Sequence, residues 1–332
     1  MTDATLRHGA ESASHFAKLA GVTVRYIGSG PYCYANSLAM VMGARALEPS
    51  VIEVLTGSPF GATFIAGLPF FSPVGWDPDI GLDFAITALG WACERTAGGD
   101  ATEALGRLRE ASEAGPVLVG PVEFGLLRYL PGMGTPIGSD HFVVVIGVDH
   151  ATVTLHDPHG HPYATLPHDA FTAAWRAETV PYPSTPFTMR AGFHRVRDVD
   201  VATALRRSLP DAVRWLEASS GEPSTTGRPG AGDAVERLAG LVAAGLDEQT
   251  HGHLIHFAVR VGTRRLADAS VWLGAIGHDG AAEIADLQAR LLGASQYDLV
   301  TGDHLAAAAA LRALAPTYAQ LRAALTRDGS TR

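Results

Sequence analysis

The chain has two cysteines, and one of them lies where a nucleophile is expected. Cys33 follows the pair Gly30-Pro31, which interrupts regular structure, and precedes a segment with apolar residues at helical spacing. We therefore expect Cys33 at the first turn of a helix, where the partial positive charge of the helix end stabilises a thiolate, the reactive form. The alternative is a structural thiol, because free cysteines are among the most buried residues in proteins. Cys93 is interpreted as a structural thiol of this kind, in the core.

A histidine and an aspartate that would complete the site lie in one predicted hairpin. Residues 142–148 and 152–156 have strand patterns and are separated by a short turn near Asp149. A turn centred on Asp149 would place His141 directly opposite Asp157, with Cβ atoms about 4.5–5.5 Å apart. The carboxylate would fix the tautomer of the imidazole, whose other nitrogen would act as base for the nucleophile. The alternative is a surface hairpin with an incidental ion pair, because a register slip of one residue would separate the two side chains.

Helix and strand patterns divide the chain into two parts. Up to residue 198 both patterns occur, and beyond it only helical spacing continues, so we predict an α+β domain over residues 1–198 and a helical domain over residues 199–332. The elements expected in the first domain are strands at 116–120, 142–148, 152–156 and 187–196 and helices at 34–47 and 101–113. The helices expected in the second domain are 202–219, 234–246, 254–273, 281–292 and 304–325.

Composition and charge exclude several classes of protein. The 332 residues are 47% hydrophobic and 18% charged, which is typical of a globular chain with a sizeable core. The net charge of −9 argues against nucleic-acid binding and against a polybasic membrane anchor. No apolar run approaches the roughly 20 residues of a membrane span, and the first residues lack the apolar core of a signal peptide. We therefore expect a cytoplasmic protein with reduced cysteines and no membrane partner; a homo-oligomer is compatible with the sequence.

Two blocks of the sequence resemble known cysteine enzymes. The segment from Cys33 to Ser37 is similar to the start of the nucleophile helix of papain-like peptidases. Over roughly residues 25–180 the chain resembles the BtrH-type family, named for the butirosin-biosynthesis acyltransferase, and its framework also resembles the double-glycine-leader peptidases of bacteriocin exporters. The motifs that carry the resemblance are Ser58-Pro-Phe-Gly61, Gly115-Pro-Val-Leu-Val-Gly-Pro-Val-Glu123, Tyr129, His141-Phe-Val-Val-Val-Ile-Gly-Val-Asp149 and Asp157-Pro158.

The resemblance implies a papain-like fold, in which a nucleophile helix packs on an antiparallel sheet, followed by an all-α domain. It implies a cysteine acyltransferase or thioester hydrolase of a natural-product pathway, which takes an acyl group from a carrier-protein thioester onto Cys33 and passes it to an amine or to water. An acyl carrier protein and a small-molecule acceptor would be the partners. The phosphopantetheine-bound acyl group would be a substrate, and no cofactor is expected. The alternatives are a soluble cysteine peptidase or amidase and a non-catalytic binding protein that keeps the fold.

The oxyanion donor departs from the papain pattern. Papain-like peptidases have a glutamine upstream of the cysteine, and this chain has Ile27 at the corresponding place. Loss of one oxyanion donor typically costs about 10²–10³ in rate, so ordinary peptidase activity is not expected. The donors available besides the backbone N–H of Cys33 are Asn36, Ser29, Tyr26 and Tyr32. Asn36 is also the only asparagine of the chain, so the residue that orients the histidine is expected to be acidic.

Further polar side chains are expected around the site. Those expected to bind substrate are Tyr34, Glu123 and Tyr129. A histidine cluster around Asp157 is expected to form a polar rim rather than a metal site, because no framework of cysteine or carboxylate ligands accompanies it; it comprises His156, His159 and His161. An arginine group near the domain junction is expected to form a solvated or inter-domain face, with carrier-protein binding as the alternative; it comprises Arg190, Arg195, Arg197, Arg206 and Arg207.

Overall fold

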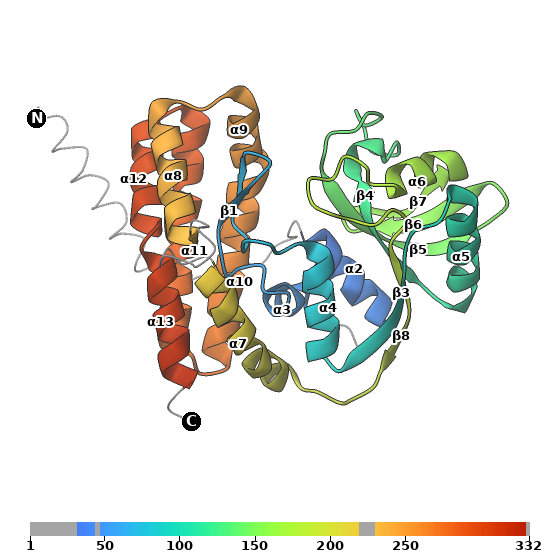
Figure 1. The fold of residues 1–332 in the computed structure, drawn as a ribbon, viewed down its shortest axis with the longest axis horizontal. Coiled ribbons are helices and arrows are strands. Elements are labelled where there is room, and N and C mark those ends of the chain that lie inside the picture. The colour runs from blue at the N-terminus through green and yellow to red at the C-terminus, as the bar shows by residue number, and fades with distance from the viewer. Residues whose placement is uncertain (1–31, 44–46, 219–229, 330–332) are drawn as a thin grey trace, which may run out of the picture. The chain divides into compact units, whose positions relative to one another are not determined.

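The computed structural model describes residues 32–43, 47–218 and 230–329 (Figure 1). These residues form two compact units: a sheet unit of residues 32–56 and 77–207, and a helical unit of residues 57–76 and 208–329. The predicted α+β class and the helical C-terminal region are confirmed. The division differs from the boundary expected after residue 198, because residues 57–76 belong with the C-terminal helices although both neighbouring segments of the chain belong to the sheet unit.

The sheet unit is built on six antiparallel strands in the order β3-β8-β4-β5-β6-β7. Their bounds are β3 (Trp91–Thr96), β4 (Val117–Glu123), β5 (Asp140–Val148), β6 (Thr152–Asp157), β7 (His161–Pro167) and β8 (Met189–Arg195). Strands β4, β5, β6 and β8 match the four predicted strands. The two edge strands, β3 and β7, were not predicted, since most of their residues are exposed or half-buried and give no apolar run.

The helices of the sheet unit cover both faces of the sheet. Phe142 of β5 meets the ring of Tyr34 edge-on, with centroids 6.0 Å apart, on the face that receives α2. Because strand residues alternate between faces, Val143 and Val145 point the other way, into a core shared with α5 and α6. The bounds are α2 (Cys33–Met42), α3 (Pro49–Leu55), α4 (Pro78–Ala88), α5 (Ala101–Ala114), α6 (His168–Trp175) and the short 3₁₀ helix η2 (Phe124–Leu126).

Two helices of the sheet unit begin and end for reasons visible in the sequence. Helix α5 starts at a capping box, in which the Asp100 side chain accepts from the backbone N–H of Glu103 and the Glu103 side chain accepts from the N–H of Asp100. Helix α2 ends at Gly43, whose φ of 64° is open to glycine at low cost. It is therefore shorter than the helix predicted over residues 34–47, of which residues 44–46 lie outside the described part of the chain.

The helical unit consists of long helices with a small hairpin beside them. Its elements are β1 (Thr63–Ile65), β2 (Leu68–Phe70), the second part of α7 (Val201–Ala218), α8 (Ala231–Ala244), α9 (Glu248–His253), the π-helix η3 (Leu254–Ala258), α10 (Val259–Ala275), α11 (Asp279–Thr301), α12 (His304–Leu314) and α13 (Thr317–Gly329). The single helix predicted over residues 304–325 is divided in two at Pro316, which lacks the N–H that a continuous helix needs.

Residues 57–76 are fixed to the C-terminal helices by specific contacts. The ring of His253 bonds the carbonyl oxygen of Pro69 through Nε2 at 2.8 Å, and Nη1 of Arg265 donates to the carbonyl oxygen of Phe71 at 3.3 Å. Gly262 of α10 lies directly against Phe71, because a Cβ atom there would be 2.7 Å from the Phe71 Cβ. Among the described helices, none has the length and apolar character needed to cross a bilayer.

Candidate functional site

Cys33 is the first residue of α2, as predicted. The preceding residue, Tyr32, caps the helix through its carbonyl oxygen, which accepts from the backbone N–H of Asn36 at 2.9 Å and from Nδ2 of Asn36 at 2.7 Å. One turn on, Oγ of Ser37 donates to the carbonyl oxygen of Phe142 at 3.2 Å. These contacts hold the start of α2 against β5.

The thiol of Cys33 lies beside the strand segment that carries His141. It accepts a hydrogen bond from the backbone N–H of Phe142, the residue that follows His141, and it responds to the charge of Asp140, the residue that precedes His141. Pairing of β5 with β6 begins only at Val144, and this leaves the start of β5 accessible to α2 on that side. Cys33 remains partly exposed.

The thiol is not the stabilised thiolate that the helix position predicted. Burial is the largest influence and raises the pKa of Cys33 well above its ordinary value, and the carboxylates of Asp140 and Glu53 raise it further. Hydrogen bonds from the N–H groups of Phe142 and Tyr34 act in the opposite direction and are outweighed. Cys33 is therefore a neutral thiol at neutral pH, and it needs a base to become a nucleophile.

His141 and Asp157 are brought together as predicted, but through a different register. Nε2 of His141 lies 2.7 Å from Oδ1 of Asp157. The strands pair Val144 with His156, so Asp157 is opposite residue 143 and His141 is one diagonal step away. The predicted direct pairing of residues 141 and 157 is therefore wrong by two positions. A two-residue shift keeps every side chain on its face, and diagonal neighbours are within reach of long side chains, so the contact survives.

Asp157 receives three hydrogen bonds. Besides His141, the backbone N–H of His159 donates to Oδ1 at 2.7 Å and the hydroxyl of Tyr129 donates to Oδ2 at 2.8 Å. Burial acts to raise the pKa of Asp157, but the hydrogen bond and charge of His141, followed by the bonds from His159 and Tyr129, outweigh it and hold the pKa below its ordinary value. A carboxylate only accepts, so Nε2 of His141 carries hydrogen and Nδ1 is left as the basic nitrogen.

The imidazole of His141 is held in a mostly enclosed place. His141 and Asp157 are only 5% and 3% exposed. The ring of Phe124 lies 4.8 Å from that of His141 between centroids, and the ring of His159 lies 6.3 Å away in an edge-on arrangement. The imidazole is thus held by one hydrogen bond to Asp157 and by two neighbouring aromatic rings. A fixed ring orientation of this kind suits a general base.

Two of the three residues expected to bind substrate have structural roles. Tyr34 is buried and its hydroxyl donates to the carboxylate of Glu53. Glu123 is 1% exposed, and its carboxylate accepts from the backbone N–H groups of Gly125 at 3.1 Å and Ile137 at 2.9 Å and from the hydroxyl of Thr179. Both side chains are buried and bond to groups of the protein itself. The expectation that Tyr34 and Glu123 bind substrate is corrected for this reason.

The third expected substrate residue, Tyr129, instead supports Asp157. Its pKa is raised by burial and by the adjacent Asp157, so it stays a neutral donor. Of the oxyanion candidates, Tyr32 is buried at the helix cap, and Asn36 uses one amide hydrogen at the same cap. Ser29 and Tyr26 lie outside the described residues.

The histidine cluster does not gather at one point. Nδ1 of His156 accepts from the backbone N–H of Tyr163 at 3.1 Å, whereas His161 pairs with Asp157 in the β6–β7 ladder. Within the described ranges, no group of three or more His, Cys, Asp or Glu side chains is arranged to hold a metal ion.

Arg190 is not part of a solvated face. It is 0% exposed, and its guanidinium bonds Asp79 at 2.6 Å and Asp83 at 2.6 Å. It ties β8 to α4, because a buried guanidinium has to be paired. No local sequence pattern indicates these partners, since both acids lie more than a hundred residues before Arg190.

Asp140 and Tyr182 are site residues that sequence reasoning missed. The hydroxyl of Tyr182 donates to Oδ2 of Asp140 at 3.0 Å. Burial, then Asp140 itself, raises the pKa of Tyr182 well above its ordinary value, and the charge of Cys33 contributes as well. Asp140 is recognisable as the acid that precedes His141 in the sequence. Tyr182 lies in a loop after α6, and no local pattern connects it with the site.

Comparison with known proteins gives similarity without an activity. Residues 225–326 match the family described as the YobF C-terminal domain, and those of them that the structure describes lie in the helical unit. The chain is also 34% identical over 160 residues to a protein of Bacillus subtilis (strain 168) described as uncharacterized protein YobF. That alignment covers 47% of this chain and 52% of the relative, so the two match over about half of their lengths.

Proposed function

We propose that this protein is a cysteine-nucleophile acyltransferase or thioester hydrolase whose sheet unit has a papain-like arrangement, as its resemblance to the BtrH-type family implies. The observation that carries the proposal is that the Cys33 thiol accepts a hydrogen bond from the backbone N–H of Phe142, the residue that follows a histidine whose Nε2 is bound to Asp157. A thiol, a directed imidazole and a buried carboxylate are the groups that nucleophilic acyl transfer requires. The expected partners are an acyl carrier protein and a small-molecule acceptor.

In the first half of the reaction, the acyl group moves to the cysteine. Nδ1 of His141 takes the proton of Cys33 while the sulfur attacks the carbonyl carbon of the donor thioester. The tetrahedral intermediate collapses as the bond from carbon to the donor sulfur breaks, and His141 returns the proton to the departing thiolate. Asp157 stabilises the imidazolium through the hydrogen bond to Nε2, without itself taking up a proton.

In the second half, an amine or a water molecule attacks acyl-Cys33. His141 accepts the proton of the attacking group, and the bond between the acyl carbon and the Cys33 sulfur breaks. The proton then passes from His141 to the sulfur, which restores the neutral thiol. Transfer and hydrolysis differ only in which acceptor reaches the acyl group first.

A thioester is favoured over a peptide as donor, because the thiolate that a thioester releases is a better leaving group than the amine that a peptide releases.

The test is the intact mass of the full chain after exposure to a panel of acyl thioesters, with matched peptide substrates in parallel. We expect an acyl adduct that maps to Cys33, is absent in Cys33→Ala and is retained in Cys93→Ala. Cys93 is the matched control because it is the other thiol of the chain and is also partly exposed. An unmodified chain across the panel would refute the proposal, and turnover of peptides alone would favour a peptidase.

A second candidate, a binding protein without catalysis, is favoured by one observation. The carboxylates of Asp140 and Glu53 oppose formation of the thiolate. Acids with this effect are rare around a dedicated cysteine nucleophile. This candidate predicts that the chain binds a ligand at the cysteine without forming an adduct, so the same mass measurement separates it from the acyltransferase.

A further inference from the structure

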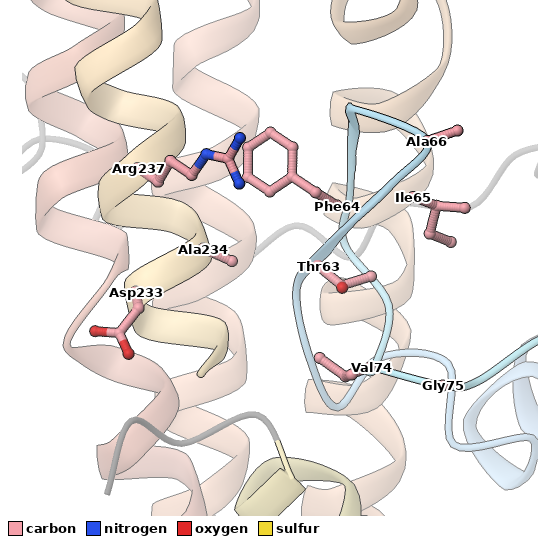
Figure 2. Close-up of a pocket in the computed structure, with 9 residues that line it drawn as sticks. All are labelled: Thr63, Phe64, Ile65, Ala66, Val74, Gly75, Asp233, Ala234 and Arg237. Atoms are coloured by element: carbon pink, nitrogen blue, oxygen red, sulfur yellow. The ribbon is translucent and has the colours of Figure 1, made fainter. Parts of the chain in front are cut away.

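The helical unit contains a cavity that is separate from the residues of the cysteine site. Residues of β1, the segment that follows β2 and the first turns of α8 line a half-open cavity of about 440 Å³ (Figure 2). Pockets for small ligands have volumes of about 300–1,000 Å³, so the cavity is of suitable size. Val74 and Ala234 give it an apolar lining, and Phe64, Arg237 and the acid Asp233 also line it.

Arg237 is exposed and lies at the rim of this cavity. Its guanidinium lies over the ring of Phe64, with Cζ 4.4 Å from the ring centroid, and Figure 2 shows the side chain reaching from α8 toward that ring. The ring occupies one flat face of the guanidinium and leaves the N–H donors at its edge. Within the described parts of the chain, no carboxylate lies within ion-pair distance of Arg237 and no acceptor takes a hydrogen bond from it.

The acids nearest to Arg237 on α8 are engaged elsewhere. Asp233 lies one turn earlier, where an ion pair with Arg237 would be usual, but its Oδ2 accepts from the backbone N–H of Gly230 at 3.1 Å. Figure 2 shows the Asp233 side chain directed away from the Phe64 ring. Glu236 lies 3.6 Å from Nε of Arg312 on α12. The cation of Arg237 is thus neutralised by neither neighbour.

We propose that this cavity binds a carboxylate carried on a small apolar body. The planar fork of Arg237 matches both oxygens of a carboxylate, and Phe64 holds that fork in place. The apolar side chains of Val74 and Ala234 would receive the body of the ligand. This site lies beyond the proposed acyl-transfer function and does not depend on Cys33.

The test is titration of the full-length Cys33→Ala variant with benzoate, followed by ligand-observed NMR, with benzamide as the neutral control of the same shape. We expect saturable binding of benzoate, and binding of benzamide weaker by about tenfold or more, as expected for loss of a charged hydrogen-bonding group. Arg237→Gln should weaken benzoate binding by a similar factor, whereas Arg260→Gln, at an exposed position of α10 that does not line the cavity, should leave it unchanged. Phe64→Leu should also weaken binding, because the guanidinium loses its support.

Three outcomes would overturn the proposal. They are the absence of saturable benzoate binding, equal binding of benzoate and benzamide, and full affinity in Arg237→Gln. Tighter binding of phenyl phosphate than of benzoate would also overturn it, because the cavity would then be a phosphate site. Since the titration uses a chain without the Cys33 sulfur, its result is independent of whether the chain transfers acyl groups.

Discussion

Removal of the Tyr129 hydroxyl should destabilise the protein in a way that depends on pH. The hydroxyl donates to Oδ2 of Asp157 at 2.8 Å, on the oxygen that His141 does not use. Tyr129→Phe keeps the ring and deletes this donor. The buried carboxylate then loses one of its three hydrogen bonds, so the pKa of Asp157 in the folded protein should rise.

The size of the effect follows from the charge of the acceptor. A hydrogen bond to a charged group contributes about 1.5–3 kcal/mol to stability, and one between neutral groups about 0.5–1.5 kcal/mol. Because the folded pKa of Asp157 is lowered, its contribution is present above the unfolded value of about 3.9 and is lost as pH falls through the folded pKa. The stability lost in Tyr129→Phe should therefore be about 1.5–3 kcal/mol at neutral pH and should shrink by roughly half in acid.

Denaturant unfolding of both proteins from neutral pH down to about pH 2, through the lowered pKa of Asp157, measures this difference. Tyr163→Phe is the matched control, because Tyr163 is 71% exposed in the same unit and the change should cost less than about 0.5 kcal/mol. A loss in Tyr129→Phe that is no larger than the control, or one that stays constant with pH, would refute the assigned role of this hydrogen bond.

The rate of Cys33 alkylation by iodoacetamide, measured by peptide mass spectrometry, should be low at neutral pH and should still increase above about pH 8.5, because the pKa of the thiol is raised. Asp140→Asn should shift this increase in rate to lower pH. Arg190→Met should lower the free energy of unfolding by about 1–2 kcal/mol in denaturant titrations, because β8 loses its charged hydrogen bonds to Asp79 and Asp83 of α4. Gly262→Ala should lower it by about 1–3 kcal/mol in the same measurement, because the new Cβ would lie 2.7 Å from the Cβ of Phe71.

Each of these three predictions has a control within the same chain. The pKa of Cys93 is raised by burial and does not depend on Asp140, so its alkylation should be unchanged by Asp140→Asn. Arg195→Gln breaks an exposed pair and should cost less than about 1 kcal/mol. Gly274→Ala adds a Cβ at an ordinary 3.7 Å from Ala282 in the same helix as Gly262 and should be neutral or slightly stabilising. Equal effects of a variant and its control would contradict the corresponding prediction.

The central hairpin could be predicted from the sequence because its information is local. Apolar runs define β5 and β6, and the polar turn between them is short, so the His141 and Asp157 side chains were expected on one face. The exact pairing was not predictable. A bulge between Val145 and Gly147, together with a turn centred later than Asp149, shifts the strands, and neither has a clear sequence pattern.

Other features depend on contacts between distant segments. The pKa of Cys33 is raised by burial and by the charges of Asp140 and Glu53, which are far from it in sequence. The position of residues 57–76 with the C-terminal helices likewise rests on long-range contacts, such as that of Pro69 with His253. Local periodicity carries no information on these partners, which explains why the domain division and the state of the thiol were not predicted.

The central claim is that His141 is the base for Cys33, and the rate at which Cys33 is acylated in a single turnover tests it most directly. With a thioester that labels the wild-type chain, His141→Gln should slow formation of acyl-Cys33 by about 10²–10⁴, the usual contribution of a positioned base. His159→Gln, which keeps the backbone N–H that bonds Asp157, should have a much smaller effect. A His141→Gln variant that acylates Cys33 as fast as the wild type would contradict the claim.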